Sequence, residues 1–293
     1  MSAPLRAPSG ARLGRGLAWG FLGVLAFSAT LPATRLAVAA LDPVFVGLGR
    51  ALFAAVLATA LLAATRSPLP RRASWPRLAV VALGVVAGFP LLTAWAMRHV
   101  PASHGAVVVG LLPLATVVAG ALLAHERPSR RFWTCAVAGS AVVVGYALWK
   151  GGGALHVADL LLVGAVIAAA IGYAEGARLA REIGGWQVIS WALVLAAPFL
   201  AIPTWRAAGG LADAPWTAWA GFAYVAVVSA YVGFFAWYKG LAEGGIAAVG
   251  QVQLLQPFLT IFLSVLLLGE ALDPATFVAA GLVILAIAIG RSG

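Results

Sequence analysis

The stretch LLPLATVVAGALLAHERP, residues 111–128, recurs in altered form as LLQPFLTIFLSVLLLGEALDP, residues 254–274. The proline and the glutamate keep one spacing in both copies: Pro257 follows Pro113 by 144 residues, and Glu270 follows Glu126 by 144 residues. In a chain of 293 residues this spacing indicates two copies of one unit. We expect a tail over 1–15, a first copy over 16–150 and a second over 151–293.

The composition places the chain in a membrane. Hydrophobic residues make up 63% and charged residues 10% of it, whereas a soluble protein has about half and about a quarter. Apolar stretches of about 20 residues, long enough to cross a bilayer as helix, recur from end to end. The lone Cys135 excludes a disulfide within the chain. The sequence predicts an all-α polytopic membrane protein.

Ten transmembrane helices are predicted. Their expected ranges are 16–33, 44–64, 78–97, 102–124, 133–148, 160–177, 187–202, 218–237, 246–268 and 275–289. The first, preceded by three arginines, resembles a cleaved signal peptide. The repeat argues against cleavage, because Arg35-Leu-Ala after the first helix matches Arg178-Leu-Ala after the sixth.

Charge predicts the orientation. The net charge of +10 would suggest nucleic acid in a soluble protein, but here the basic residues lie in short connections between apolar spans. With the N-terminus in the cytoplasm, fourteen of the 19 Lys and Arg face the cytoplasm, and the four on the other side are Arg35, Arg98, Lys150 and Arg206. This bias satisfies the positive-inside rule. Both termini are therefore expected in the cytoplasm.

Five helices per copy is an odd number, so the two copies should cross the membrane in opposite directions. Inverted repeats of this kind are typical of secondary transporters, in which the two halves surround a site near the bilayer midplane. The predicted architecture is two inverted five-helix repeats around a central cavity.

Two prolines and two glutamines are the first candidates for function. Pro113 and Pro257 lie within predicted helices, where proline removes a backbone hydrogen bond and kinks the helix; we interpret them as paired hinges, with a tolerated bend as the alternative. Gln253 and Gln256 lie on nearly the same helical face as Pro257. Their amides would bind a polar substrate or join neighbouring helices.

Aromatic and charged side chains supply further candidates. Trp95, Tyr173, Tyr231 and Trp237 lie deep in predicted helices or at matched positions of the repeat, and would stack on a substrate or pack helices together. Arg50 lies about two turns into a span, where it would reach the interface or attract an anionic group.

His104, near the start of the fourth helix, would titrate, bind substrate or do neither. The acidic residues all lie at or near predicted span ends, Glu175 being closest to the membrane interior, which favours a facilitator or exchanger over a proton pump. No HExxH, glycine-rich phosphate loop or Ser-His couple of the kind that catalytic motifs contain is present. The sequence therefore predicts neither an enzyme nor a bound metal or cofactor.

The doubled Pro-to-Glu segment, the glycines that follow it (Gly139 and Gly281) and the matched arginines resemble the drug/metabolite transporter superfamily, EamA-type, and within it the YddG-type exporters of aromatic amino acids. The resemblance implies ten helices in two inverted repeats around a cavity. Carried over position by position, it implies that substrate contacts Phe27, Thr30, Gly110, Leu112, Tyr173 and Gln256. A tryptophan frequent in the family is replaced here by Phe27 and Ala170.

The predicted function is export of amino acids, including aromatic ones, or of similar small amphipathic metabolites across a bacterial-type inner membrane by alternating access. Its expected partners are that small-molecule substrate and the lipid bilayer, without nucleic acid. A carrier of a lipid-linked metabolite, or a structural membrane protein without a transport cycle, is the alternative.

Overall fold

The computed structural model describes residues 10–124, 130–150, 156–271 and 273–291, so Glu126 of the repeated segment lies outside the described residues. Every regular element in these ranges is helical, and none is a strand. The all-helical prediction is confirmed.

The first half contains eight α-helices, with two π-helical segments and one 3₁₀ turn between them. In chain order they are α1 (Gly10–Ser28), α2 (Thr30–Val38), the π segment η1 (Phe45–Gly49), α3 (Arg50–Ala64), the 3₁₀ turn η2 (Arg72–Ser74), α4 (Trp75–Val81), the π segment η3 (Ala82–Gly88), α5 (Phe89–Ala96), α6 (Ala102–Val109), α7 (Leu112–Ala124) and α8 (Arg130–Lys150).

The second half has the same mixture of helix types. Its elements are α9 (Val157–Ile183), α10 (Gly185–Arg206), the 3₁₀ turn η4 (Leu211–Asp213), α11 (Trp216–Ala223), the π segment η5 (Tyr224–Val232), α12 (Gly233–Gly244), α13 (Ile246–Gly250), the 3₁₀ segment η6 (Gln251–Leu255), α14 (Gln256–Leu268) and α15 (Pro274–Arg291).

Seven helical stretches in the described residues are long and apolar enough to cross a membrane. They are 11–38, 45–64, 72–96, 102–123, 157–183, 185–206 and 216–244. Three shorter apolar helices cover 137–146, 252–268 and 274–286. Large apolar side chains such as Leu83, Leu122 and Phe199 lie more than 70% exposed, as lipid-facing residues should. The number of spans and the inverted relation of the halves stay predictions.

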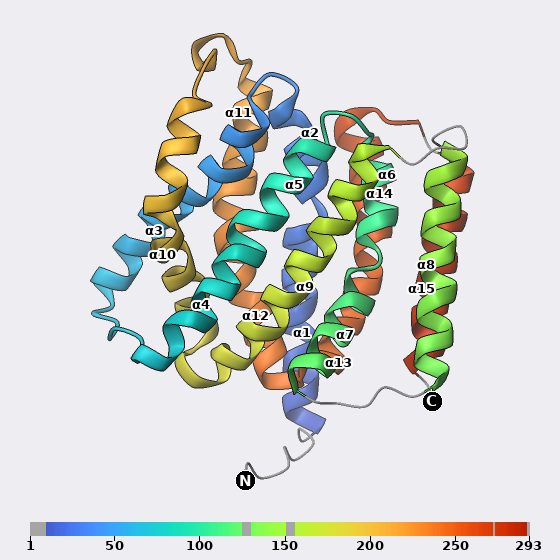
Figure 1. Ribbon diagram of the computed structural model, residues 1–293, viewed down its shortest axis with the longest axis horizontal. Coiled ribbons are helices and arrows are strands. Elements are labelled where there is room, and N and C mark those ends of the chain that lie inside the picture. Colours follow the sequence, from blue (N-terminus) through green and yellow to red (C-terminus); the bar gives the residue numbers. More distant parts are fainter. Residues whose placement is uncertain (1–9, 125–129, 151–155, 272, 292–293) are drawn as a thin grey trace.

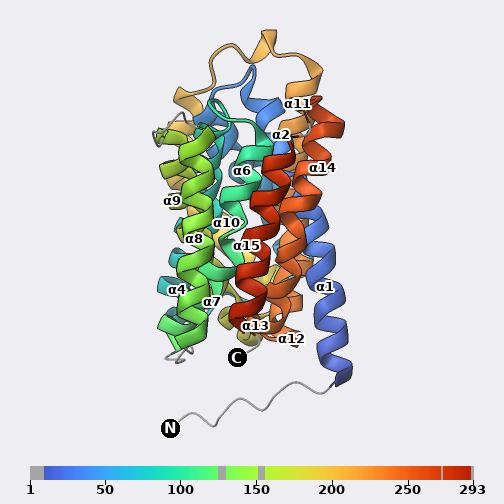
Figure 2. The same cartoon turned by 90° about the vertical axis from the view of Figure 1, so that its right-hand side faces the viewer.

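The helices run between two ends, which we call upper and lower as they appear in Figures 1 and 2. At the lower end α1 begins and α15 ends; at the upper end lie residues 97–101, between α5 and α6, and residues 207–215, between α10 and α11. Helices α8 and α15 pack against each other along one flank, and α6 lies against α15.

Glycines allow α1 and α12 to approach closely at the lower end. A Cβ atom on Gly16 would lie 2.6 Å from the backbone of Gly244, and one on Gly240 would lie 2.7 Å from the nitrogen of Gly20. Spacing of small residues by four places them on one helix face, where they permit close backbone packing in membranes. This contact fixes the position of α1 relative to α12.

Both repeated prolines lie where a span changes its helical geometry. The fourth span breaks at Gly110 and Leu111, between α6 and α7, and Pro113 lies in the first turn of α7. The chain after α13 passes through the 3₁₀ segment η6 and resumes as α14, with Pro257 in the first turn. The missing proline N–H and the ring account for both interruptions.

Candidate functional site

Wide π-helical turns surround the middle of the molecule. Segments η3 and η5 lie within two spans, and η1 begins a third. Arg50 follows η1, Phe89 follows η3, and Ser229 lies within η5. Short π-helical stretches inside α-helices are rare and frequently occur at functional sites. Here each one brings a side chain to a common cavity.

That cavity has a volume of about 20 Å³, room for about one water molecule. Its walls come from both halves of the chain: Phe27, Thr30, Arg50, Val85, Phe89, Tyr173, Ser229, Phe234 and Gln256. Among these are four residues implied by the family resemblance, Phe27, Thr30, Tyr173 and Gln256. Their role in binding stays a prediction.

Aromatic rings form one wall of the cavity. The ring of Phe27 lies 5.0 Å from that of Phe234 and 6.5 Å, nearly parallel, from that of Tyr173. Trp237 supports this wall from behind, because its ring lies 5.6 Å from Tyr173 and its side chain is fully buried. The rings of Phe27, Tyr173 and Phe234, which we call the aromatic wall, offer flat apolar faces to an occupant.

Polar groups also line the cavity. The hydroxyls of Thr30 and Ser229 lie 2.8 Å apart in a buried hydrogen bond. The side chain of Gln256 joins them at the start of α14. An occupant with one polar end and one apolar end would find both kinds of surface in this cavity.

Arg50 is the charged residue of the cavity. It is only 3% exposed, and its Nε has no hydrogen-bond partner in the described part of the chain. A side chain that reaches the membrane interface would be more exposed, so this burial does not fit the alternative that Arg50 extends to the interface. Arg50 instead lines the cavity together with Tyr173 and Gln256.

Pro32 explains why the first span bends beside the cavity. Proline at this position has no N–H for the carbonyl of Ser28, four residues earlier. The hydroxyl of Thr260, on α14, donates to that carbonyl at 2.8 Å. Helices α1 and α2 are thereby joined to α14 at the level of the cavity.

Two residues implied by the resemblance lie beside the cavity without lining it. Leu112 is 2% exposed and belongs to the apolar core. Gly110 lies against the other repeated proline, because a Cβ atom there would be 3.2 Å from Cγ of Pro257. The two helix breaks therefore contact each other, and a larger residue at 110 would separate them.

Gln253 is also outside the cavity lining. It is 1% exposed, and neither its amide nitrogen nor its amide oxygen has a hydrogen-bond partner among the described residues. An unpaired amide inside a membrane protein is costly. Gln253 therefore does not join helices by a hydrogen bond in this conformation.

Tyr231 and Trp95 are directed elsewhere. The hydroxyl of Tyr231 bonds Ser190 of α10 at 3.0 Å, and its ring packs on Phe235. Trp95 is 41% exposed on α5 and is absent from the cavity lining. We remove both from the candidate site, because a side chain held by α10 or facing outward does not reach the cavity.

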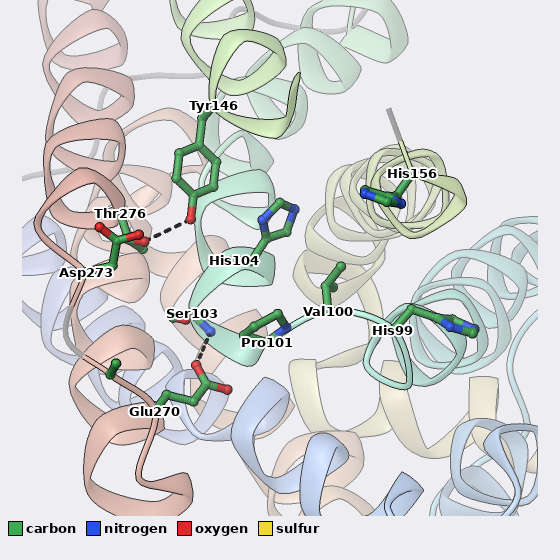
Figure 3. Close-up of a pocket in the computed structure, with 11 residues that line it drawn as sticks. His99, Val100, Pro101, Ser103, His104, Tyr146, His156, Glu270, Asp273 and Thr276 are labelled. Atoms are coloured by element: carbon green, nitrogen blue, oxygen red, sulfur yellow. Dashed lines mark hydrogen bonds between the residues drawn. The ribbon is translucent and has the colours of Figure 1, made fainter. Parts of the chain in front are cut away.

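His104 lies at the upper end, in a second pocket of about 600 Å³ (Figure 3). It is not isolated, because its Nε2 lies 2.7 Å from Oδ1 of Asp159 and both side chains are buried. In Figure 3 the hydroxyl of Tyr146 points to Thr276 in the same pocket. The His104–Asp159 pair joins α6 to α9, and neither residue lines the cavity of Phe27 and Arg50.

Glu270, the glutamate of the second repeated segment, borders the same pocket. Its two carboxylate oxygens accept hydrogen bonds from the backbone N–H groups of Ala102 and Ser103, at 2.8 and 3.0 Å; Figure 3 shows the bond from Ser103. These N–H groups begin α6 and have no partner within the helix. A carboxylate also complements the positive end of the helix dipole.

At the lower end a groove of about 870 Å³ is lined by residues of α1, α10 and α12. Its polar lining includes Gln187, Lys239 and Glu243, and Lys239 lies 4.1 Å from the ring centre of Trp19. Leu22 and Val232, which also line it, are about half exposed on the outer surface. The groove thus reaches the lipid-facing side of the molecule.

Sequence reasoning missed Val85, Phe89, Ser229 and Phe234 as lining residues. Phe234 could have been predicted from helical spacing, since it precedes the candidate Trp237 by three residues and so shares its helical face. The others gave no signal, because π-helical turns shift the side chains that follow them relative to an α-helical register.

Comparison with known proteins identifies the family. The model of the EamA-like transporter family matches twice, over residues 14–148 and 156–290. The uncharacterized transporter YdeK of Bacillus subtilis is 47% identical over 279 residues, which cover 93% of this chain and 95% of that protein.

Two more distant proteins are also similar. The probable terminal-alkyne amino-acid exporter of Streptantibioticus cattleyicolor is 27% identical over 89% of this chain and 88% of its own. A solved crystal structure, described only as that of a protein, matches 95% of this chain and 97% of the chain in that structure. The TM-score is 0.67 and the sequence identity 18%, so this similarity shows the fold alone. With both halves matched, this chain belongs to the EamA-like transporter family and is a multi-pass membrane protein.

Proposed function

We propose that this protein exports amino acids, aromatic ones included, or similar small amphipathic metabolites across the bacterial inner membrane by alternating access. One observation carries the proposal: a cavity lined by both halves combines the aromatic wall with hydroxyl, amide and guanidinium groups. These groups suit a molecule that has an apolar side chain and a polar head.

An inverted architecture is part of the proposal. Matched offsets between the two halves, two successive matches to one family model and the excess of basic residues in lower connections support it. The three shorter apolar helices would complete ten spans. Both termini would then face the cytoplasm at the lower end.

Alternating access is supported by the size of the cavity. A volume of about 20 Å³ is too small for an amino acid, so substrate entry requires the helices to move apart. The contact between Gly110 and Pro257 lies where both repeated spans are interrupted. We therefore assign the hinge to Pro113 and Pro257. Gln253, unpaired in this conformation, would gain a partner in another.

The relative from Streptantibioticus cattleyicolor, by its name an amino-acid exporter, supports this substrate class. The test is counterflow of radiolabelled L-phenylalanine in proteoliposomes, with the other amino acids as competitors, with and without a pH gradient. We expect saturable counterflow and competition among amino acids. Absence of any competition would overturn the substrate class.

A variant at the cavity tests the assigned site. Gln256→Leu should reduce counterflow at least tenfold, because it removes a polar group from the lining. The control is Thr65→Val, an exposed position at the end of α3. Normal counterflow in Gln256→Leu would remove this residue from the site.

The lower groove favours a second candidate, a carrier of a lipid-linked metabolite, because it opens beside exposed Leu22 and Val232. Cysteine labelling separates the two. An amino-acid transporter predicts that Gln256→Cys reacts with a water-soluble maleimide from at least one side and that L-phenylalanine protects it. Labelling of Leu22→Cys blocked by lipid-linked substrate, with Gln256→Cys inert, would favour the second candidate.

A further inference from the structure

Among the arginines that the structure describes, Arg50 combines deep burial with the absence of a hydrogen-bond or salt-bridge partner. Arg35 donates to backbone carbonyls, and Arg77 and Arg178 bond Glu175. Arg50 is 3% exposed, its Nε is unpaired, and it takes part in none of the salt bridges found among the described residues. Within the described part of the chain it is therefore a buried cation without a counter-ion.

A charge in such a place is costly unless something neutralises it. Ionised groups inside a membrane protein face a cavity or another charge, and they mark substrate pathways. The guanidinium group stays protonated at any physiological pH, so loss of its proton does not relieve the cost. An anionic occupant of the cavity would relieve it.

The lining indicates which anion. A guanidinium binds a carboxylate through two parallel hydrogen bonds. The same cavity is lined by the aromatic rings of Phe27, Tyr173 and Phe234. None of the lining residues is acidic, so the cavity holds no charge that selects an ammonium group.

We propose that Arg50 binds the carboxylate of the substrate while the aromatic wall receives its apolar part, and that the amino group contributes little to recognition. The substrate class is thus amphipathic monocarboxylates, of which apolar amino acids are one kind. This inference rests on the proposed export function and narrows it to a chemical requirement.

Three probes that share one ring and chain length test the requirement. They are L-phenylalanine, 3-phenylpropionate, which lacks the amino group, and L-phenylalaninamide, which lacks the carboxylate. In the purified wild-type protein we expect 3-phenylpropionate to inhibit L-phenylalanine counterflow within about threefold of unlabelled L-phenylalanine. The amide should be at least tenfold weaker, about the factor that one charge-assisted hydrogen bond contributes.

Variants assign the preference to Arg50. In Arg50→Gln the tenfold advantage of the carboxylate over the amide should fall below about threefold, whereas Arg50→Lys should keep part of it, because lysine keeps the charge without the planar fork. Arg98→Gln, at an exposed arginine of the upper end, is the matched control and should behave as the wild type. An unchanged preference in Arg50→Gln would overturn the inference.

Binding measured without transport separates this inference from the proposed function. Thermal unfolding in detergent, with and without each probe, reports binding even if a variant or the wild type does not transport. One outcome is that 3-phenylpropionate stabilises the wild type but not Arg50→Gln, while no counterflow is seen. This outcome would overturn the proposed export function and leave the role of Arg50 intact. Equal stabilisation of wild type by the amide and the two carboxylates, or by none of them, would overturn the role of Arg50.

Discussion

Arg35 and Arg178 occupy matching places in the two halves, yet their contacts differ. At the upper end, Arg35 donates to the carbonyls of Met97 and Val100, at 2.5 and 2.8 Å, and so joins α2 to the chain between α5 and α6. At the lower end, Arg178 bonds Glu175 of its own helix at 3.2 Å. The matching residue therefore ties two elements together at one end only.

The surroundings of the two arginines differ as well. Glu270 also connects elements at the upper end, since it accepts the first N–H groups of α6. At the lower end Arg77 of α4 bonds Glu175 and Glu182 of α9, α1 packs on α12 through glycines, and next to that contact lies the groove of about 870 Å³. The comparison teaches that the matched arginine joins two elements only at the upper end, whereas at the lower end a different arginine and close backbone packing connect the helices.

Gly240→Ala should have the largest effect on stability, because it places a methyl group in the contact between α1 and α12 at the lower end. The new Cβ would lie 2.7 Å from the nitrogen of Gly20, so α1 and α12 must separate. We expect a loss of about 3 kcal/mol of unfolding free energy, the upper range for overpacking, measured by denaturant titration in detergent. The matched control is Gly14→Ala on α1, where nothing lies within 4 Å; equal stability of the two variants would contradict close packing.

Arg35→Ala should come next, because two carbonyls at the upper end lose a charged donor. A cost of about 2 kcal/mol is expected for such bonds. The variant should destabilise the conformation in which Arg35 holds the carbonyls of Met97 and Val100. A cysteine at Ser229 should therefore react faster with a maleimide added from the upper side. An unchanged labelling rate would show that Arg35 does not hold the upper end closed.

Glu270→Ala removes the cap of α6 and should cost about 1 kcal/mol, a typical value for a helix cap. Glu270→Gln keeps an acceptor without the charge and should recover part of that stability. The thermal unfolding midpoints of the three proteins, compared in one detergent, check this order. A Gln variant less stable than the Ala variant would argue against a capping role.

Arg178→Ala should have the smallest effect, about 0.3 kcal/mol, because its side chain is 39% exposed and pairs within one helix. Beside Arg35→Ala this variant measures the asymmetry of the two ends. If both variants lose the same stability and label alike, the comparison between the ends fails.

The family and the helical membrane fold were predictable because their signals are local. The doubled segment with Pro113 and Pro257 and the apolar runs are visible in the sequence alone, and the family and the all-helical class are confirmed. Phe27, Thr30, Tyr173 and Gln256 line the cavity in the structure, although whether they bind substrate stays a prediction.

What the sequence did not reveal depends on contacts across the fold. The partner of His104 could not be predicted, because Asp159 is 55 residues away in the chain and only packing of α6 on α9 brings the two together. The charge on Arg50 was visible, but its lack of a partner was not. Trp95 looked deep within a span, yet it faces outward on α5.

The π-helical turn before Arg50 has a consequence for insertions and deletions. A π turn holds one more residue than an α-helical turn, and each residue advances an α-helix by about 100°. Deletion of one residue from η1 (Phe45–Gly49) would restore a continuous α-helix and rotate Arg50 by about that angle relative to the chain before η1. The position of the cavity's charge therefore depends on the length of this segment as much as on the arginine itself.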